Sequence, residues 1–191
     1  MKAQFRIMAC VVAALASGAA VAGVNTNPGT AAGTQGTGGQ VEFTGEITDT
    51  SCNIDSASAS QTVDLGAWAK SYFTSTVTET TKTPFHIKVK DCPSSVKTVA
   101  VLFDGKKDSN NPDLLAVNGG AAGVGIKLYN DDKSTKIPVG TLSDSKTVKA
   151  GSGADALGSA DLTFYADYMA DGDTIATGQA NGTADFNMVY N

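Results

Sequence analysis

The sequence has little of what enzymes and nucleic-acid-binding proteins commonly use. Its 191 residues include one histidine, one tryptophan and three cysteines, and its 14 basic residues are outnumbered by 19 acidic ones. The basic residues form no cluster, which argues against a nucleic-acid partner because a phosphate backbone attracts Lys and Arg. No run of about 20 apolar residues follows the N-terminal head, so we expect no membrane-spanning helix there.

Catalytic and metal-binding patterns are also missing. His86 falls on the polar face of an expected strand, which favours a solvated side chain over a general base or a ligand. No serine stands in a Gly-x-Ser-x-Gly motif, and the Asp-rich turns lack the spacing of a calcium loop. We therefore expect no enzyme activity, no catalytic residue, no metal site and no cofactor.

Residues 1–22 have the pattern of a secretory signal peptide. Lys2 and Arg6 precede an apolar run, and Ala20-Val21-Ala22 fits a small-x-small cleavage site, so the predicted cleavage lies between Ala22 and Gly23. Removing 22 residues leaves 169, enough for one domain with a core. Two basic residues go with the head, so the formal charge changes from −5 to −7.

Two cysteines follow the signal peptide, Cys52 and Cys92. In an exported chain an even count predicts a disulfide, and two thiols cannot form a closed zinc site, which needs four ligands. A bridge that closes a loop of about 40 residues stabilises a fold by ~3–4 kcal/mol. We expect a structural disulfide rather than redox chemistry.

Residues 23–40 are rich in glycine and carry no charge or aromatic ring. Such a segment has almost nothing to bury and is expected to be mobile in the free chain, either as a disordered tail or as a segment that orders on a partner. From residue 41 onward, alternating apolar residues predict a single domain at 41–191.

About eight short strands and no convincing helical periodicity predict an all-β domain. In 41–47 we expect Val41, Phe43 and Ile47 to point inward, and only 67–75 suggests a short helical turn. Loops are expected at 106–113 and 144–156. The fold class is an immunoglobulin-like β-sandwich, with strands expected at 41–47, 62–66, 84–90, 97–103, 123–129, 136–139, 162–168 and 178–190.

The last of these strands has two contrasting faces, because alternate side chains in a strand point to opposite sides of its sheet. Its polar face carries mainly Asn, Gln, Thr and Asp. The strand ends one residue before the sequence does, and no further partner strand is expected after it. The pattern also fits an ordinary sheet member. The apolar face grades from glycine to large side chains: Gly178, Ala180, Gly182, Ala184, Phe186, Met188 and Tyr190.

Four motifs occur in a fixed order behind the signal peptide. They are Gly-x-Val-x-Phe-x-Gly-x-Ile at 39–47, Val-x-Leu-Gly at 63–66, Phe-x-Ile-x-Val-x-Asp-Cys at 85–92, and the terminal run with Gly178 fourteenth from the end and Tyr190 penultimate. Together they resemble the major subunits of chaperone–usher fimbriae of Gram-negative bacteria, the type 1 pilin-like family. The resemblance covers essentially the whole chain after the signal peptide.

The resemblance implies a pilin sandwich that lacks its final strand and is completed by a donor strand from another subunit. The apolar face of 178–190 would border the open groove, and Cys52 and Cys92 match the family's bridging pair. A donor segment would lie in 23–40, with Val24, Pro28, Ala31 and Ala32 as the side chains that enter the groove. The implied partners are a periplasmic chaperone, an outer-membrane usher and identical or related subunits in a head-to-tail polymer, with export through the periplasm to a fimbria on the cell surface.

Two other functions stay open. A fimbrial adhesin or minor subunit would bind a host glycan directly, and Trp68 with Tyr72 is the aromatic pair that such a site could use. A soluble periplasmic binding protein with an immunoglobulin-like fold would need the last strand to pair within its own chain. The preferred hypothesis is a structural subunit of a fimbrial shaft that polymerises by donor-strand exchange and supports adhesion, any host receptor being reached through the fimbria.

Overall fold

The computed structural model describes residues 40–47, 50–153, 156–172 and 174–191, and the chain divides into two units, residues 1–47 and 48–191. In the first unit, the described residues 40–47 form neither helix nor strand. Val41, Phe43 and Ile47 are 72%, 91% and 101% exposed. The prediction of a strand here with these side chains inward is therefore wrong, because no described strand of the same chain pairs with this segment.

The second unit is nearly all β, as the alternation predicts. Its helical elements are α1 (Ser56–Ala59) and a 3-10 turn, η1 (Lys70–Tyr72), inside the predicted helical turn at 67–75. The sequence pattern did not predict α1, a single turn in which the Asp55 side chain accepts a hydrogen bond from the backbone of Ala57 at 3.0 Å. The strands are β1 (Asn53–Ile54), β2 (Thr83–Cys92), β3 (Thr98–Gly105), β4 (Leu115–Ala116), β5 (Val124–Tyr129), β6 (Lys136–Ile137), β7 (Lys146–Thr147), β8 (Gly158–Ala170) and β9 (Ala184–Tyr190).

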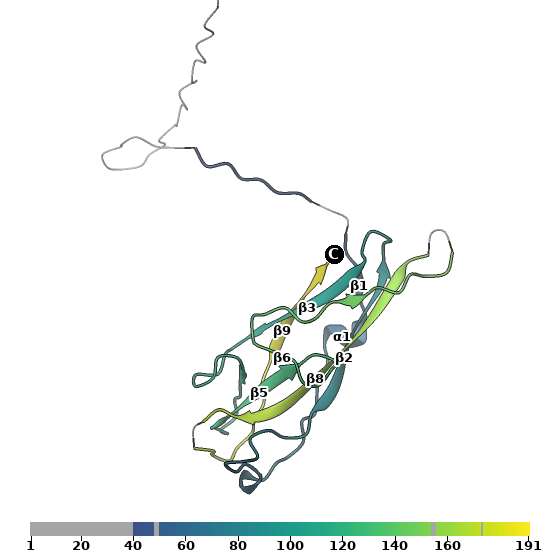
Figure 1. Ribbon diagram of the computed structural model, residues 1–191. Helices are drawn as coiled ribbons and strands as arrows, with labels where there is room; N and C mark the ends of the chain where they lie inside the picture. The colour runs from purple at the N-terminus through teal and green to yellow at the C-terminus, as the bar shows by residue number, and fades with distance from the viewer. Residues whose placement is uncertain (1–39, 48–49, 154–155, 173) are drawn as a thin grey trace, which may run out of the picture. The chain divides into compact units, whose positions relative to one another are not determined.

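The larger sheet has the order β1-β2-β8-β5-β4, with β6 paired to β5, and all its pairs are antiparallel. Figure 1 shows β8 running along the domain between β2 and β5. In β2, Phe85, Ile87 and Val89 are buried and the residues between them are exposed. Leu162 and Phe164 of β8 are buried in the same way. The strand predictions at 84–90, 123–129, 136–139 and 162–168 are confirmed.

The smaller sheet has the order β7-β3-β9, again antiparallel. Its central strand β3 buries Val99, Val101 and Phe103, which confirms the strand predicted at 97–103. The two sheets share one core of buried side chains, so the chain forms the predicted β-sandwich.

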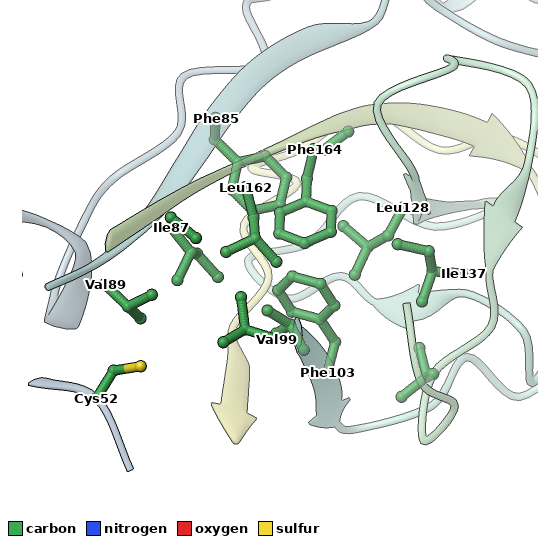
Figure 2. Close-up of a cluster of buried hydrophobic side chains, with 14 of the residues drawn as sticks. Cys52, Phe85, Ile87, Val89, Val99, Phe103, Leu128, Ile137, Leu162 and Phe164 are labelled. Carbon is green, nitrogen blue, oxygen red and sulfur yellow. The ribbon is translucent and has the colours of Figure 1, made fainter. Parts of the chain in front are cut away.

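Aromatic rings occupy the centre of that core, as Figure 2 shows. Phe103 of the small sheet meets Phe164 of the large sheet with ring centroids 5.0 Å apart and planes at 89°. Phe85 lies 5.6 Å from Phe164 and 6.0 Å from Phe103. Tilted and edge-to-face ring pairs add about 0.5–1.5 kcal/mol each beyond the area they bury.

Two further predicted strands differ from the structure. Residues 62–66 form no strand, although Val63 and Leu65 still pack against the core. The terminal strand is shorter than predicted, because β9 begins at Ala184. Before it, Asn181 bonds to Asn118 in both directions at 2.7 and 3.1 Å, and Gln179 donates to Gly119 at 2.9 Å. The chain therefore crosses to the other sheet at this point.

The predicted disulfide is present between Cys52 and Cys92, with Cα atoms 4.3 Å apart. It joins the residue before β1 to the last residue of β2. The two strands also pair directly, Asn53 with Lys90 and Ile54 with Val89. The disulfide thus fixes the start of the second unit to the end of β2.

Candidate functional site: an apolar groove beside the last strand

The last strand, β9, pairs on one edge only. Its partner is β3, from Val99 opposite Tyr190 to Gly105 opposite Ala184. Among the residues that the structure describes, no strand pairs with its other edge. The strand therefore has an open edge along its full length.

The hydrogen-bond pattern identifies which backbone groups lie on that open edge. Asn191 and Thr98 exchange both backbone hydrogen bonds, at 2.9 and 2.8 Å. In an antiparallel pair such residues alternate with residues whose N–H and C=O groups point away from the partner. The open edge therefore presents the N–H and C=O groups of Ala184, Phe186, Met188 and Tyr190.

An open cavity of about 750 Å³ lies beside this strand, and we call it the groove. One wall is the segment from Ile54 to Leu65, and the other runs from Ala180 to Phe186. The floor is made of buried or partly buried side chains from both sheets, and several of them appear in Figure 2. The floor residues are Phe85, Ile87, Phe103, Leu115, Ile126, Leu128, Ala166 and Tyr168.

The predicted groove residues divide into three groups. Ala180, Gly182, Ala184 and Phe186 line the groove. Met188 and Tyr190 are half-buried against the core but do not line the cavity. Gly178 lies outside the groove, where a Cβ would collide with the backbone of Gly120 and Ala121.

Glycine at position 182 keeps the groove floor in place. A Cβ there would lie 2.5 Å from Cδ1 of Ile126, a distance that real contacts do not reach. A side chain at this position would therefore require the end of the Ile126 side chain to shift. The small residue at this position therefore follows from the floor beneath it.

Two tyrosines connect the ends of the groove, a role that the sequence pattern does not reveal. The hydroxyl of Tyr190 donates to the carbonyl of Cys52 at 3.1 Å, which joins β9 to the start of the opposite wall. The hydroxyl of Tyr168 donates to the carbonyl of Ala180 at 2.8 Å at the other end. Burial raises the pKa of both phenols above the ordinary value, so both stay protonated donors at physiological pH.

The wall from Ile54 to Leu65 was not predicted either. Ser58 is buried and its hydroxyl accepts a hydrogen bond from the backbone of Lys88 at 3.0 Å. Gln61 donates to the carbonyl of His86 at 3.0 Å. Side-chain bonds from small polar residues thus attach this wall to β2, a role that leaves no apolar periodicity in the sequence.

Several predicted residues lie outside the described part of the chain. They are the signal peptide, the cleavage site at Ala22 and Gly23, and the donor candidates Val24, Pro28, Ala31 and Ala32. The nearest described residues upstream of the second unit are 40–47. They carry three exposed apolar side chains in alternation, Val41, Phe43 and Ile47.

His86 forms a hydrogen bond with Asp161 at the surface of the domain. Nδ1 of His86 lies 2.8 Å from the carboxylate of Asp161, and both side chains are about half exposed. Although burial opposes it, the hydrogen bond from His86 holds the pKa of Asp161 below its usual value. Within the described residues, no group of His, Cys, Asp or Glu is arranged to hold a metal ion. No helix in that part of the chain is long and apolar enough to cross a membrane.

Comparisons with known sequences identify the family of the chain. A model of the family described as "Fimbrial protein" matches residues 41–191. Long polar fimbria protein A of Salmonella typhimurium is 35% identical over 156 residues, covering 80% of this chain and 83% of that protein. The fimbrial subunit type 1 of the same species is 35% identical over 160 residues with the same coverage. The probable major fimbrial subunit LpfA of Escherichia coli O157:H7 is 35% identical over 156 residues, again 80% and 83%.

Solved structures share the fold. A type I fimbria protein of Burkholderia pseudomallei, BPSL1626, is 34% identical with a TM-score of 0.53, covering 75% of this chain and 91% of that one. The P pilus rod subunit PapA superposes with a TM-score of 0.61 at 23% identity, covering 73% of this chain and 99% of that one. The family model and the sequence relatives extend over most of the chain, so the protein belongs to the fimbrial protein family.

Proposed function

We propose that this chain is a repeating structural subunit of a fimbrial filament and that a second copy completes its sheet by donor-strand exchange. The observation that carries the proposal is the open edge of β9 beside the apolar groove. An unpaired edge beside an apolar groove favours aggregation unless it is covered. An inserted strand pairs with the edge and fills the groove with its own apolar side chains, a mode of recognition known from pilins.

The donor segment extends, on this proposal, beyond the predicted 23–40 to include residues 41–47. Val41, Phe43 and Ile47 alternate and are exposed, which is the pattern of a strand whose apolar face has no partner in its own chain. Gly45 interrupts the row, and a Cβ there would meet nothing within 4 Å. This row of three apolar side chains and one glycine could therefore face the groove of a second copy.

Burial of that row and pairing with the open edge of β9 both favour insertion of the donor strand. Each Val, Phe or Ile side chain that leaves water contributes about 1.5–3 kcal/mol. Four residues of β9 each offer one donor and one acceptor to the incoming strand, and a net backbone hydrogen bond contributes about 0.5–1.5 kcal/mol. These gains act against the cost of ordering the donor, about 1–2 kcal/mol for each residue.

A subunit with an open groove needs a partner before it meets another subunit. We propose that a periplasmic chaperone covers the groove of this chain first, that an outer-membrane usher hosts the exchange, and that the filament stands on the cell surface. The open edge of β9 and the apolar groove beside it are the surface that a chaperone would recognise. Donor and acceptor surfaces differ, so the contact is head-to-tail and propagates as an open filament.

The adhesin alternative is less well supported. The aromatic pair that a glycan site would use lies with ring centroids 4.7 Å apart at 55°, and the indole N–H of Trp68 already donates to the carbonyl of Leu65 at 2.7 Å. The relative LpfA is described as a probable major fimbrial subunit. We therefore favour a shaft subunit that supports adhesion through the filament.

A charge placed on the apolar face of the donor tests the proposal. Phe43→Asp removes about 2 kcal/mol or more of burial and places a carboxylate in the groove. Filaments formed by the purified mature chain, measured by sedimentation, should fall at least about tenfold. Thr44→Asp is the matched control, because it adds the same charge on the opposite face of the strand. Equal filament yields for the two variants would contradict donor insertion through residues 41–47.

A further inference from the structure

Three aromatic side chains form a surface cluster beside the groove, which we call the aromatic patch. Trp68 and Tyr72 lie 4.7 Å apart, and Tyr72 meets Phe73 edge-on at 5.8 Å. Tyr72 is 38% exposed, and the other two are half-buried. None of the three belongs to the buried core of the described domain. The rings therefore pack mainly on one another and leave apolar surface facing solvent.

The patch continues the wall of the groove. Leu65 lines the groove, and its carbonyl accepts the hydrogen bond from the indole N–H of Trp68 at 2.7 Å. A contiguous apolar patch that stays exposed on a folded domain is typical of an interaction site. Any partner whose strand fills the groove has this surface next to it.

The patch also lies at a defined end of the domain. The first end, the Cys52 end, contains Cys92 paired with Gly158 at the start of β8, and Tyr190 bonded to Cys52. The second end contains Met169 bridged to Glu79 near the close of β8. β8 has 13 residues and spans roughly 40 Å at 3.3 Å per residue. The segment after the patch leads within a few residues to Glu79, so the patch lies at the second end.

Head-to-tail assembly sets the direction of the donor strand. In every copy, the N-terminal segment that carries residues 40–47 connects to the domain through Cys52. β9 also finishes at this Cys52 end. If the donor strand ran parallel to β9, the folded domain of the donor subunit would lie at the Cys52 end of the acceptor. The N-terminal segment of the acceptor must leave from that same end to reach the next subunit. If the donor strand runs antiparallel to β9, the folded domain of the donor subunit lies at the second end, beside the aromatic patch. The N-terminal segment of the acceptor is then free to reach the next subunit.

The connection between donor strand and body is short. Residues 48–51 separate Ile47 from the disulfide-bonded Cys52, a span of at most about 17 Å when extended. The Cys52 end of the donor subunit must therefore come close to the second end of the acceptor. The Cys52 end of the domain carries an exposed apolar side chain, Leu157, which is 54% exposed and precedes Gly158.

From these observations we infer that the aromatic patch is the docking surface for the body of the donor subunit, a second copy of this chain. The inference depends on the proposed donor-strand exchange and adds a second contact to it. The inserted strand holds two neighbours together, and the patch fixes the angle between them. A contact of this kind stabilises the filament without taking part in strand insertion.

Two measurements on Tyr72→Ser separate the patch from the groove. The first is the binding of a synthetic peptide of residues 40–48 to the mature chain, which reports groove filling alone. The second is filament yield and the temperature at which filaments dissociate. We expect the dissociation constant of the peptide to stay within about twofold of the unchanged chain, while filament yield falls about tenfold. Tyr72→Phe keeps the ring and should restore the yield.

Leu142→Ser is the matched control, because Leu142 is 48% exposed and bridges to Leu102 in the middle of β3, away from the patch. Normal filaments from Tyr72→Ser with intact peptide binding would overturn the inference. If Tyr72→Ser loses both peptide binding and filament formation, the inference would be overturned as well, because the Tyr72 ring would then support the groove itself. A peptide that fails to bind the unchanged chain would instead contradict donor-strand exchange, and the inference would fall with it.

Discussion

One buried acid stands out among the individual residues. Asp167 of β8 has no exposed surface, and it accepts a hydrogen bond from the hydroxyl of Tyr129 at 3.1 Å. Lys127 bonds to Glu79 at 2.6 Å beside it, and Lys82 lies 4.2 Å from the centre of the Tyr129 ring. Burial raises the pKa of Asp167 to about 6 although the hydrogen bond from Tyr129 opposes the shift.

This raised pKa predicts a pH dependence of stability. The folded state holds a proton on Asp167 between pH 4 and 6 that the unfolded chain releases, so this group's contribution to the unfolding free energy falls as pH rises through that window. The effect is at most about 3 kcal/mol for a shift of about two pKa units. Asp167→Asn keeps an acceptor for Tyr129 and removes the titration. Urea unfolding at pH 4.5 and 7.5 should show a flatter profile for this variant.

An exposed acid on the same strand provides the control. Asp161 is about half exposed, and its pKa is lowered rather than raised. Asp161→Asn should therefore not flatten the profile. The same pH dependence in Asp167→Asn as in the unchanged chain would contradict a protonated Asp167.

At the scale of the elements, alternation predicted the long strands and failed where pairing decided the outcome. β2 and most of β8 bury alternate residues, and a period of two reveals that face directly. β3 and β5 also bury residues on both faces, and their largely apolar composition indicated a strand. Residues 41–47 alternate equally well but form no strand in the described part of the chain. The side-chain pattern identifies an apolar face, whereas a strand also needs a second strand whose backbone forms hydrogen bonds with it.

The candidate site was predictable in part for the same reason. Ala184 and Phe186 line the groove as the terminal alternation suggested. Gly178 does not, because the chain pairs with residues near Gly119 before β9 begins. The opposite wall, which includes Ser58, depends on side-chain hydrogen bonds with β2. Such bonds connect residues about 30 positions apart and leave no local pattern in the sequence.

The disulfide provides a prediction at this scale. It closes a loop between residues 40 positions apart and fixes the wall that begins at Cys52 to the end of β2. Its loss in a Cys52→Ser, Cys92→Ser double variant should lower the unfolding free energy by ~3–4 kcal/mol. Urea unfolding with and without a reductant measures this. The reductant should weaken the unchanged chain and leave the double variant unaffected, and an unchanged chain insensitive to reductant would contradict the prediction.

At the scale of the whole molecule, the fold explains why this protein should assemble. On the proposed function, the groove and the open edge of β9 would accept a strand, and the exposed apolar residues of 41–47 would supply one. Since the two surfaces differ, each copy can be acceptor and donor at once, and the contact repeats without closing. The sequence excess of acidic residues, with a formal charge of −5, favours solubility of a subunit that has not yet been incorporated.

Amide hydrogen exchange along β9 tests the central claim most directly. In the free subunit, amides of Asp185, Asn187 and Val189 bond to β3 and should exchange slowly, while those of Phe186, Met188 and Tyr190 face the open edge and should exchange fast. Adding the peptide of residues 40–48, or assembling filaments, should slow the second set by at least about a hundredfold, which corresponds to about 2.7 kcal/mol of added protection. Slow exchange of that set in the free subunit, or no change on filling, would contradict an open sheet completed by another molecule.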